Sequence, residues 1–443
     1  MASSLWEWRY RQKYCHIAPM KKLNNYLSNL LKNDFTKGVT ILSLGSIATQ
    51  AISFFLSLIV AKFFFPQDFA LFALLSTYAT TFSLFCGLRL EQTLLLSTNS
   101  KQLTSNLHSA LLTTLLMTTL GVVLCFLFFL FLNITLNYTL VPLWGGSLTI
   151  SSIQTNLSIR KSFFKKTIVF RILGSLLPYC FVLLFYHLDI KDKLMISMAT
   201  GAIVVGAISL IDIFVDLKNN SLPSIHTLLF SFRENRELIK SNLPQAALDN
   251  FKNIFIVTSI GHFWGATALG CYAFIMRILL GPVTLLGYSF SQMFCRHMSD
   301  LKETPFDVKI FFNVFFKRLI VFTTCFLVLI IICFSLGIFN VIGRQWLTAT
   351  PYAIALAPWA SLIIIASTLS HTPLVFNKQS KSLQLAMIGT FFSLSTLIVS
   401  GISKLPFIYF LIIFSGVNCL YLVLVVFWYY TTVQQFAKND EEK

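Results

Sequence analysis

Three charged residues, Asp249, Lys252 and Arg277, lie within stretches that otherwise have the composition of transmembrane helices. A charge at the centre of an apolar helix costs about 2.5–3.5 kcal/mol on insertion scales, so such side chains usually face a wet cavity, a partner or a substrate. An arginine suits a phosphate because its planar fork donates two parallel hydrogen bonds. These residues indicate a charged interior that contacts an anion; a salt bridge between Arg277 and Asp249 is the main alternative.

The stretch around Asp249 is polar on one helical face. Asn242, Gln245, Asp249, Lys252 and Asn253 share that face. Asp249 and Lys252, three residues apart, can pair on the helix and could serve only to position it. Alternatively they line a cavity, and their pairing changes with substrate or with a coupling ion. Since desolvation favours proton uptake by a carboxylate, Asp249 is the candidate for ion coupling.

The first apolar stretch carries a similar stripe of small polar residues. It consists of Thr36, Thr40, Ser43, Ser46, Gln50, Ser53 and Ser57. Steps of three and four residues place all of them on one helical face. Serine and threonine often serve as small packing residues between membrane helices. The alternative is the wall of a hydrated cavity, for which Ser46, Gln50 and Ser53 are the candidate binding residues.

Arg89 and Glu91 follow the second apolar stretch. They could form a first binding site for substrate at the cytoplasmic end of the helix. Charges at a helix end are also common simply because long side chains reach the interface.

The elements that position these residues are predicted to be membrane spans. The chain has 443 residues, of which 56% are hydrophobic and 12% charged, and its mean hydropathy is +0.74. A soluble domain carries about 25% charged residues, and about 20 apolar residues suffice to cross a bilayer. Twelve such spans are predicted, at 38–61, 68–88, 107–132, 138–159, 167–188, 194–217, 242–262, 267–295, 310–336, 351–376, 383–402 and 405–433.

The net charge of +17 is distributed as membrane topology requires. With the N-terminus inside, 27 of the 34 Lys and Arg residues fall on the cytoplasmic side and five on the outer side. This asymmetry follows the positive-inside rule and places both termini in the cytoplasm. The basic residues thus set topology and can contact anionic lipid, and no nucleic acid is expected as a partner.

The predicted fold is an all-α polytopic membrane protein with about twelve helices in two six-helix bundles. A basic cytoplasmic segment, 1–37, precedes the N-terminal bundle, 38–217. A cytoplasmic linker, 218–241, leads to the C-terminal bundle, 242–433, and a tail, 434–443. An offset of 200 residues matches several aromatic and small residues between the halves, which suggests an internal repeat with its site at the interface.

Enzymatic chemistry has little support in the sequence. There is no Walker A, HExxH or GxSxG motif. The longest segment between spans has about 24 residues, too short for a catalytic domain. No catalytic residue, metal site or cofactor is therefore expected.

Several segments resemble bacterial oligosaccharide flippases of the multidrug/oligosaccharidyl-lipid/polysaccharide exporter superfamily. Leu88-Arg89-Leu90-Glu91-Gln92 resembles their "LRYE" element, although Leu90 stands where the family often has an aromatic residue. The other similar segments are Phe263-Trp264-Gly265, Leu269-Gly270-Cys271-Tyr272, Arg277 to Pro282, Ser291-Gln292-Met293-Phe294, Trp346 to Trp359 and Lys378-Gln379. Together they extend over nearly the whole chain.

The resemblance implies two bundles around a cavity that opens alternately to each side of the bacterial inner membrane. The implied substrate is an undecaprenyl-diphosphate-linked repeat unit of O-antigen or a related polysaccharide, carried to the outer leaflet. Lys252, Arg277 and Arg89 would contact the diphosphate, and Asn253 and the polar stripe the sugars. A proton or sodium gradient is the candidate energy source, and a polysaccharide polymerase and a chain-length regulator are candidate partners. The alternatives are a cation-coupled multidrug exporter of the same superfamily and, with less support, a membrane glycosyltransferase or polymerase.

Overall fold

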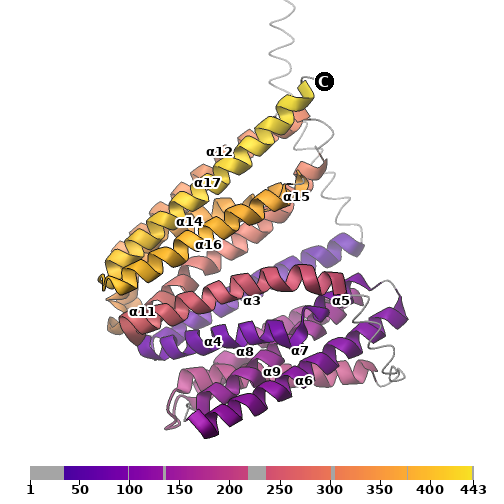
Figure 1. Ribbon diagram of the computed structural model, residues 1–443, viewed down its shortest axis with the longest axis vertical. Coiled ribbons are helices and arrows are strands. Elements are labelled where there is room, and N and C mark those ends of the chain that lie inside the picture. Colours follow the sequence, from indigo (N-terminus) through magenta and orange to yellow (C-terminus); the bar gives the residue numbers. More distant parts are fainter. Residues whose placement is uncertain are drawn as a thin grey trace, which may run out of the picture.

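The computed structural model describes residues 34–97, 99–132, 136–217, 236–300, 305–376 and 378–441, and these residues form helices and no strands (Figure 1). Most of the predicted N-terminal segment 1–37 and of the linker 218–241 lie outside them. The predicted all-α class is therefore confirmed.

The N-terminal half comprises seven α-helices and one short 3-10 helix within the described residues. These are α3 (Asp34–Ala61), α4 (Pro66–Gly87), α5 (Leu90–Leu96), α6 (Ser100–Leu132), η1 (Leu136–Thr139), α7 (Leu140–Arg160), α8 (Phe164–Phe185) and α9 (Lys193–Leu217). The C-terminal half comprises α11 (Arg236–Asp300), α12 (Pro305–Ser335), α13 (Ile338–Ile342), η2 (Arg344–Trp346), α14 (Ala349–Thr368), α15 (Thr372–Val375), α16 (Gln379–Ile402) and α17 (Phe407–Glu441).

Ten of the described helices are long and apolar enough to cross a membrane. One of them, α11, is two helices joined at Gly265. The polar helix α7 is not among the ten; it packs against α4, α5, α6, α8 and α9, where Thr149 and Gln154 are buried. Its position among other helices explains its lower hydropathy, because it need not face lipid. With α7 and both parts of α11 counted, the predicted number of about twelve is confirmed.

Gly265 makes the turn between the two parts of α11. Its φ of 84° and ψ of 174° belong to a region that is essentially restricted to glycine. We expect Gly265→Ala to destabilise the protein by about 1–3 kcal/mol through backbone strain. Steric crowding cannot be the cause, since a Cβ at Gly265 would have no heavy atom within 4 Å. Thermal unfolding in detergent would measure the effect.

Gly416 in α17 provides the matched control. A Cβ there also meets nothing within 4 Å, and its φ is outside the positive range. Gly416→Ala should therefore leave stability unchanged or raise it slightly, because alanine is the better helix former. Equal melting temperatures for both variants would contradict the assignment of strain to Gly265.

The two halves form separate bundles that converge at one end of the molecule (Figure 1). We call this end, where α3 ends and α4 begins, the outer end, following the predicted topology. One hydrophobic cluster there contains buried residues of both halves, including Phe69 of α4 and Phe274 of α11. The other two clusters lie within single halves. The halves are thus joined mainly through the core at the outer end.

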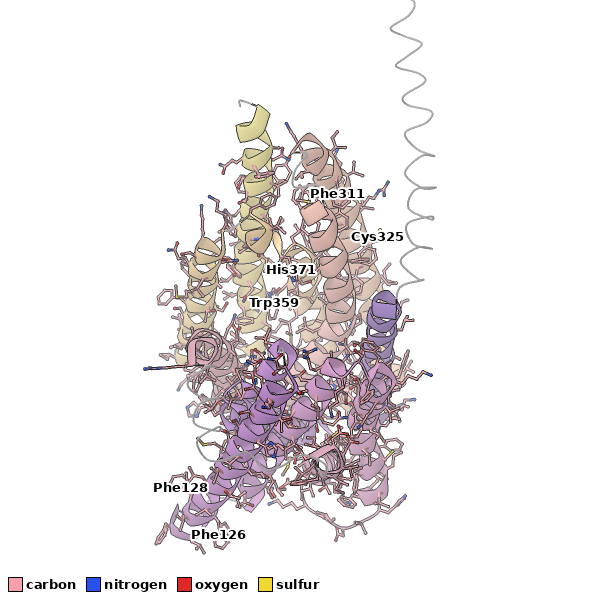
Figure 2. The ribbon with its side chains drawn as sticks, turned by 90° about the vertical axis from the view of Figure 1, so that its right-hand side faces the viewer. Phe126, Phe128, Phe311, Cys325, Trp359 and His371 are labelled. Carbon is pink, nitrogen blue, oxygen red and sulfur yellow. The ribbon has the colours of Figure 1, made fainter. Side chains whose placement is uncertain are left out.

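The outer surface of the bundles is apolar. In the view of Figure 2, Phe126 and Phe128 of α6 lie at the far edge of the N-terminal half, and each is 50% exposed. Trp359 and His371 lie in the C-terminal half above it. Large exposed apolar side chains suit a lipid surface, and together with the ten apolar helices they identify a multi-pass membrane protein.

Candidate functional site

Arg277 lies where the two halves meet. Its Nη2 donates to Tyr179 Oη of α8 at 2.5 Å and to Ser53 Oγ of α3 at 3.4 Å. The Tyr179 hydroxyl in turn donates to the Ser53 carbonyl at 3.1 Å. The guanidinium carbon is 5.6 Å from the Phe72 ring centroid and 5.7 Å from that of Tyr179. Ser53 and Arg277, both predicted site residues, are therefore in contact.

All of these contacts are with neutral groups. Among the side chains that the structure describes, no carboxylate lies within ion-pair distance of Arg277, so the alternative salt bridge to Asp249 is not formed. The hydrogen bonds to described side chains use only Nη2. The remaining N–H groups of the guanidinium form no hydrogen bond with a described side chain. Arg277 is therefore a half-buried cation, held in place, that is suited to bind an anion.

A second arginine contacts the same helix. Arg171 of α8 donates through Nη1 to Ser46 Oγ, and that hydroxyl donates to the Leu42 carbonyl at 2.8 Å. Ser46 and Ser53 are seven residues apart, or about 10 Å along α3. Two cations thus lie against α3 at successive levels. Arg171 lies within the predicted span 167–188 but was not among the predicted site residues.

The polar stripe of α3 has mixed surroundings. Ser46 and Ser53 accept hydrogen bonds from arginines, whereas Ser57 is buried and bonds only to the carbonyl of Phe54 in its own helix. Gln50, between them in sequence, is exposed. The contacts of Ser46 and Ser53 thus join α3 to α8 and α11, and the predicted role of the stripe as the wall of a hydrated cavity stays a prediction.

Asp249 and Lys252 of α11 are not joined in an ion pair in the described structure. Asp249 and Asn253 are exposed, whereas Lys252 is half-buried. Three residues separate their directions by about 60° around the helix, so one side chain can enter the protein while the other faces outwards.

Arg89 and Glu91 line a polar cavity of about 200 Å³, which we call the cytoplasmic pocket, following the predicted topology. Other polar residues around it are Thr80, Ser83, Thr149, Ser152 and Asn250. Arg89 Nη1 lies 3.9 Å from Glu91 Oε1, while Arg89 Nε and Glu91 Oε2 are buried without a hydrogen-bond partner. Asn250 belongs to α11, so the pocket brings the two halves of the chain together.

Burial raises the pKa of Glu91 above its ordinary value of 4.5, and a backbone hydrogen bond and Arg89 partly offset this. The backbone here is strained: Leu88 and Arg89 both have positive φ, at 47° and 63°. A Cβ on Gly87 would lie 2.5 Å from Glu91 Oε2. Glycine at this position therefore leaves the room in which the Glu91 carboxylate packs against the end of α4. Strain of this kind is typical of functional sites.

The outer end is closed by direct contacts between the halves. Trp346 Nε1 donates to the Ala61 carbonyl at 2.7 Å, and its ring lies 4.2 Å from that of Phe274 and 5.1 Å from that of Phe69. Trp346 is fully buried. A Cβ on Gly270 of α11 would lie 1.6 Å from the carbonyl oxygen of Pro66 in α4. The two backbones therefore approach closely enough to exclude a passage between them.

Comparison with solved structures identifies the fold. No family model and no curated protein matches the chain. Lipid II flippase MurJ in an inward closed conformation matches with a TM-score of 0.69 and 14% identity, over 90% of each chain. An inward-facing multidrug resistance MATE family transporter of the MOP superfamily matches with a TM-score of 0.55 and 12% identity, over 89% of this chain and 96% of that one.

A MOP superfamily transporter from Pyrococcus furiosus, described as having a binding pocket of reverse polarity, also matches. Its TM-score is 0.51 and its identity 12%, over 92% of this chain and 98% of that one. At such identities the likeness concerns the fold alone. The chain is a multi-pass membrane protein with the fold of MOP-superfamily transporters.

Proposed function

We propose that the protein is a flippase that moves undecaprenyl-diphosphate-linked oligosaccharide repeat units from the cytoplasmic to the periplasmic leaflet of the bacterial inner membrane. The proposal rests on the surroundings of Arg277. This residue of α11 contacts α3 and α8, and no carboxylate of the described residues lies within ion-pair distance of it. A cation kept unneutralised inside a membrane protein is costly unless its ligand is an anion.

The arrangement of the other polar groups supports an anionic, sugar-bearing substrate. Arg171 contacts the same helix as Arg277, and Lys252 of α11 is a further half-buried cation. Gln50 and Asn253 are exposed and can hydrogen-bond sugar hydroxyls. Arg89, in the cytoplasmic pocket, would meet the diphosphate first. The lipid tail would stay in the bilayer during the transfer.

Alternating access would require the contacts between the halves to rearrange. The outer end is closed by Trp346 and by the approach of Gly270 to Pro66. Transport would require these contacts to part while the cytoplasmic end closes, as in a rigid-body movement of two bundles. Substrate bound at Arg277 would then be exposed to the periplasmic side, where a polymerase with its chain-length regulator would accept the repeat unit.

A cation-coupled multidrug exporter is the second candidate function. Asp249, exposed on α11, provides a carboxylate that would suit a cationic drug. A drug-resistance assay in a host without its own pumps separates the two functions.

Deletion and complementation tests the flippase directly. We expect loss of long-chain surface polysaccharide, with lipid-linked repeat units trapped on the cytoplasmic side, and rescue by the intact gene. An unchanged surface would favour the multidrug exporter. Repeat units that reach the outer leaflet but stay unpolymerised would instead indicate a role in polymerisation.

Asp249 is proposed as the ion-coupling group. Asp249→Asn should remove the dependence of transport on an imposed proton or sodium gradient, because the amide cannot ionise. Flux into proteoliposomes with and without each gradient measures this. Asp189→Asn, which alters an exposed carboxylate outside the helices, is the control and should keep full gradient dependence. Unchanged dependence in Asp249→Asn would assign Asp249 a structural role.

A further inference from the structure

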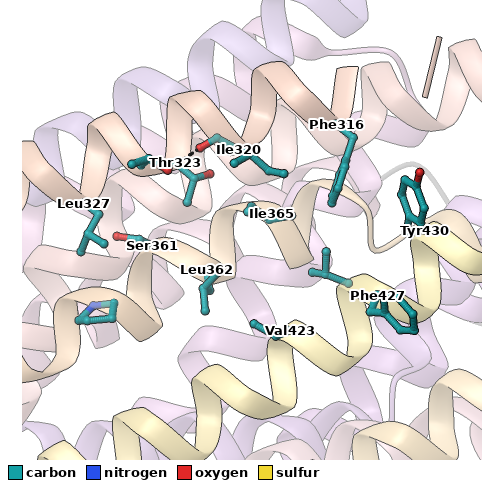
Figure 3. Close-up of a pocket in the computed structure, with 13 residues that line it drawn as sticks. Phe316, Ile320, Thr323, Leu327, Ser361, Leu362, Ile365, Val423, Phe427 and Tyr430 are labelled. Carbon is teal, nitrogen blue, oxygen red and sulfur yellow. Dashed lines mark hydrogen bonds between the residues drawn. The ribbon is translucent and has the colours of Figure 1, made fainter. Parts of the chain in front are cut away.

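An apolar groove of about 580 Å³ lies between α12, α14 and α17 (Figure 3). Phe316, Ile320 and Leu327 of α12 form one wall, with Leu362 of α14 and Phe427 of α17 opposite. From Phe316 to Leu327 the groove follows α12 for eleven residues, or about 16 Å. That is close to half of the roughly 30 Å hydrocarbon core of a bilayer. The groove therefore has the depth of one leaflet.

The groove lies away from the N-terminal half. The main packing partners of α12 are α13, α14 and α17, and in Figure 1 α12 and α17 form the part of the C-terminal bundle farthest from α4 and α6. Ile320 is 41% exposed and Phe427 63% exposed. These side chains border the groove and face outwards, so it opens onto the lipid surface rather than toward Arg277.

Two cations lie on α12 at the cytoplasmic end of the groove. Lys317 and Arg318 directly follow Phe316 and are exposed. Their side chains leave α12 about 100° and about 200° around the helix from Phe316, so Lys317 borders the groove and Arg318 lies on the far side of α12. The 20 residues that cross the hydrocarbon core, counted back from Ser335 at the end of α12, begin at residue 316. Lys317 and Arg318 are therefore at headgroup level in the cytoplasmic leaflet. No described acidic side chain lies within ion-pair distance of either cation.

A polar group inside the groove has no partner. Thr323 is 5% exposed, and its Oγ1 is buried without a hydrogen bond. It lines the groove about one and a half turns deeper than Lys317. A buried hydroxyl normally finds an acceptor. The ester carbonyl of a glycerophospholipid, just below its phosphate, would supply one, whereas the unsaturated chain of a polyprenyl lipid has no acceptor.

We propose that this groove binds one anionic glycerophospholipid of the cytoplasmic leaflet. One acyl chain lies along α12, an ester carbonyl accepts a hydrogen bond from Thr323, and the phosphate contacts Lys317. The site is distinct from the binding region around Arg277, and its occupancy does not depend on the proposed transport activity.

Native mass spectrometry of the purified full-length protein tests the site, with phosphatidylglycerol and phosphatidylethanolamine of the same chains as probes. We expect one tightly retained phosphatidylglycerol. The variant Lys317→Ala should bind it about fivefold more weakly, the factor expected for one basic residue near the headgroups. The control, Lys101→Ala, removes an exposed lysine of the N-terminal half and should bind as the wild type does.

Two further variants test the proposed positions of the lipid's acyl chain and of its ester carbonyl. Leu362→Trp should fill the groove and remove retention of both lipids. Thr323→Val should weaken binding of ester-linked phosphatidylglycerol about threefold to tenfold and leave that of an ether-linked analogue unchanged. Equal binding by wild type and Lys317→Ala would overturn the proposal. Displacement of phosphatidylglycerol from the wild type by undecaprenyl phosphate would also overturn it, since the groove would then hold a prenyl chain.

Discussion

Arg277→Ala is expected to abolish transport of the lipid-linked oligosaccharide while the protein still folds and inserts. A hydrogen bond to a charged group contributes about 1.5–3 kcal/mol, so losing a bidentate contact with phosphate lowers transport at least about 100-fold. Insertion should persist because the protein partners of Arg277, Tyr179 and Ser53, are neutral and also bond to each other. Leaflet assays in the deletion strain, with membrane protein levels measured in parallel, provide the test.

Variants at and beside Arg277 separate charge from geometry. Arg277→Lys keeps the charge but loses the planar fork, so only partial transport is expected. Tyr179→Phe removes one hydroxyl that positions the guanidinium and should have a smaller effect than either change at Arg277. If the alanine variant exports polysaccharide normally, Arg277 is not part of the binding site. If the tyrosine variant is as inactive as the alanine variant, the contact between helices matters more than the cation.

The spans were largely predictable because long apolar runs have few alternatives in a membrane. The break at Gly265 falls between two predicted spans. The short helices α5, α13 and α15 were not predicted, since segments of four to seven residues leave no periodic signal. The start of α6 at Ser100, earlier than the predicted 107, continues a polar helix into the cytoplasmic region, where hydropathy carries no information.

Helical periodicity indicated which faces carry polar residues, but not their partners. Ser46 and Ser53 fall on one face by spacing alone; their contacts with Arg171 and Arg277 depend on how α8 and α11 pack against α3. Asn250 likewise reaches the cytoplasmic pocket only through the packing of α11 on α4. Such contacts between distant segments leave no pattern in a single sequence.

The suggested repeat gains support from one contact. Gln67 Nε2 donates to Thr267 Oγ1 at 3.3 Å, and the two residues are separated by 200 positions, the predicted offset. Residues related by a two-fold axis meet each other only where they lie beside it. Gln67 begins α4 just after Pro66, and Thr267 follows Gly265 in α11, so an axis through the outer end would pass between them.

The same part of the structure leads to the second large effect. Gly270→Ala should prevent closure of the outer end, because the new Cβ would lie 1.6 Å from the Pro66 carbonyl oxygen. Both groups belong to helical backbones, which cannot move aside as a flexible side chain can. We expect the equilibrium to shift toward conformations open at the outer end, with transport lost because substrate binding from the cytoplasm requires the closed state.

Spin labels at Lys62→Cys and Lys404→Cys, exposed positions at the outer ends of the two halves, would measure this opening. Gly270→Ala should lengthen the distance between the labels, whereas Gly174→Ala, whose Cβ meets only Val205 at 3.9 Å, should not change it. Trp346→Phe removes the donor to the Ala61 carbonyl with little change in shape and should shift the distance in the same direction, but less. An unchanged distance in a folded Gly270→Ala protein would mean that α4 and α11 can separate locally without opening the outer end. In that case closure would depend on Trp346 and its aromatic neighbours rather than on the approach of the two backbones.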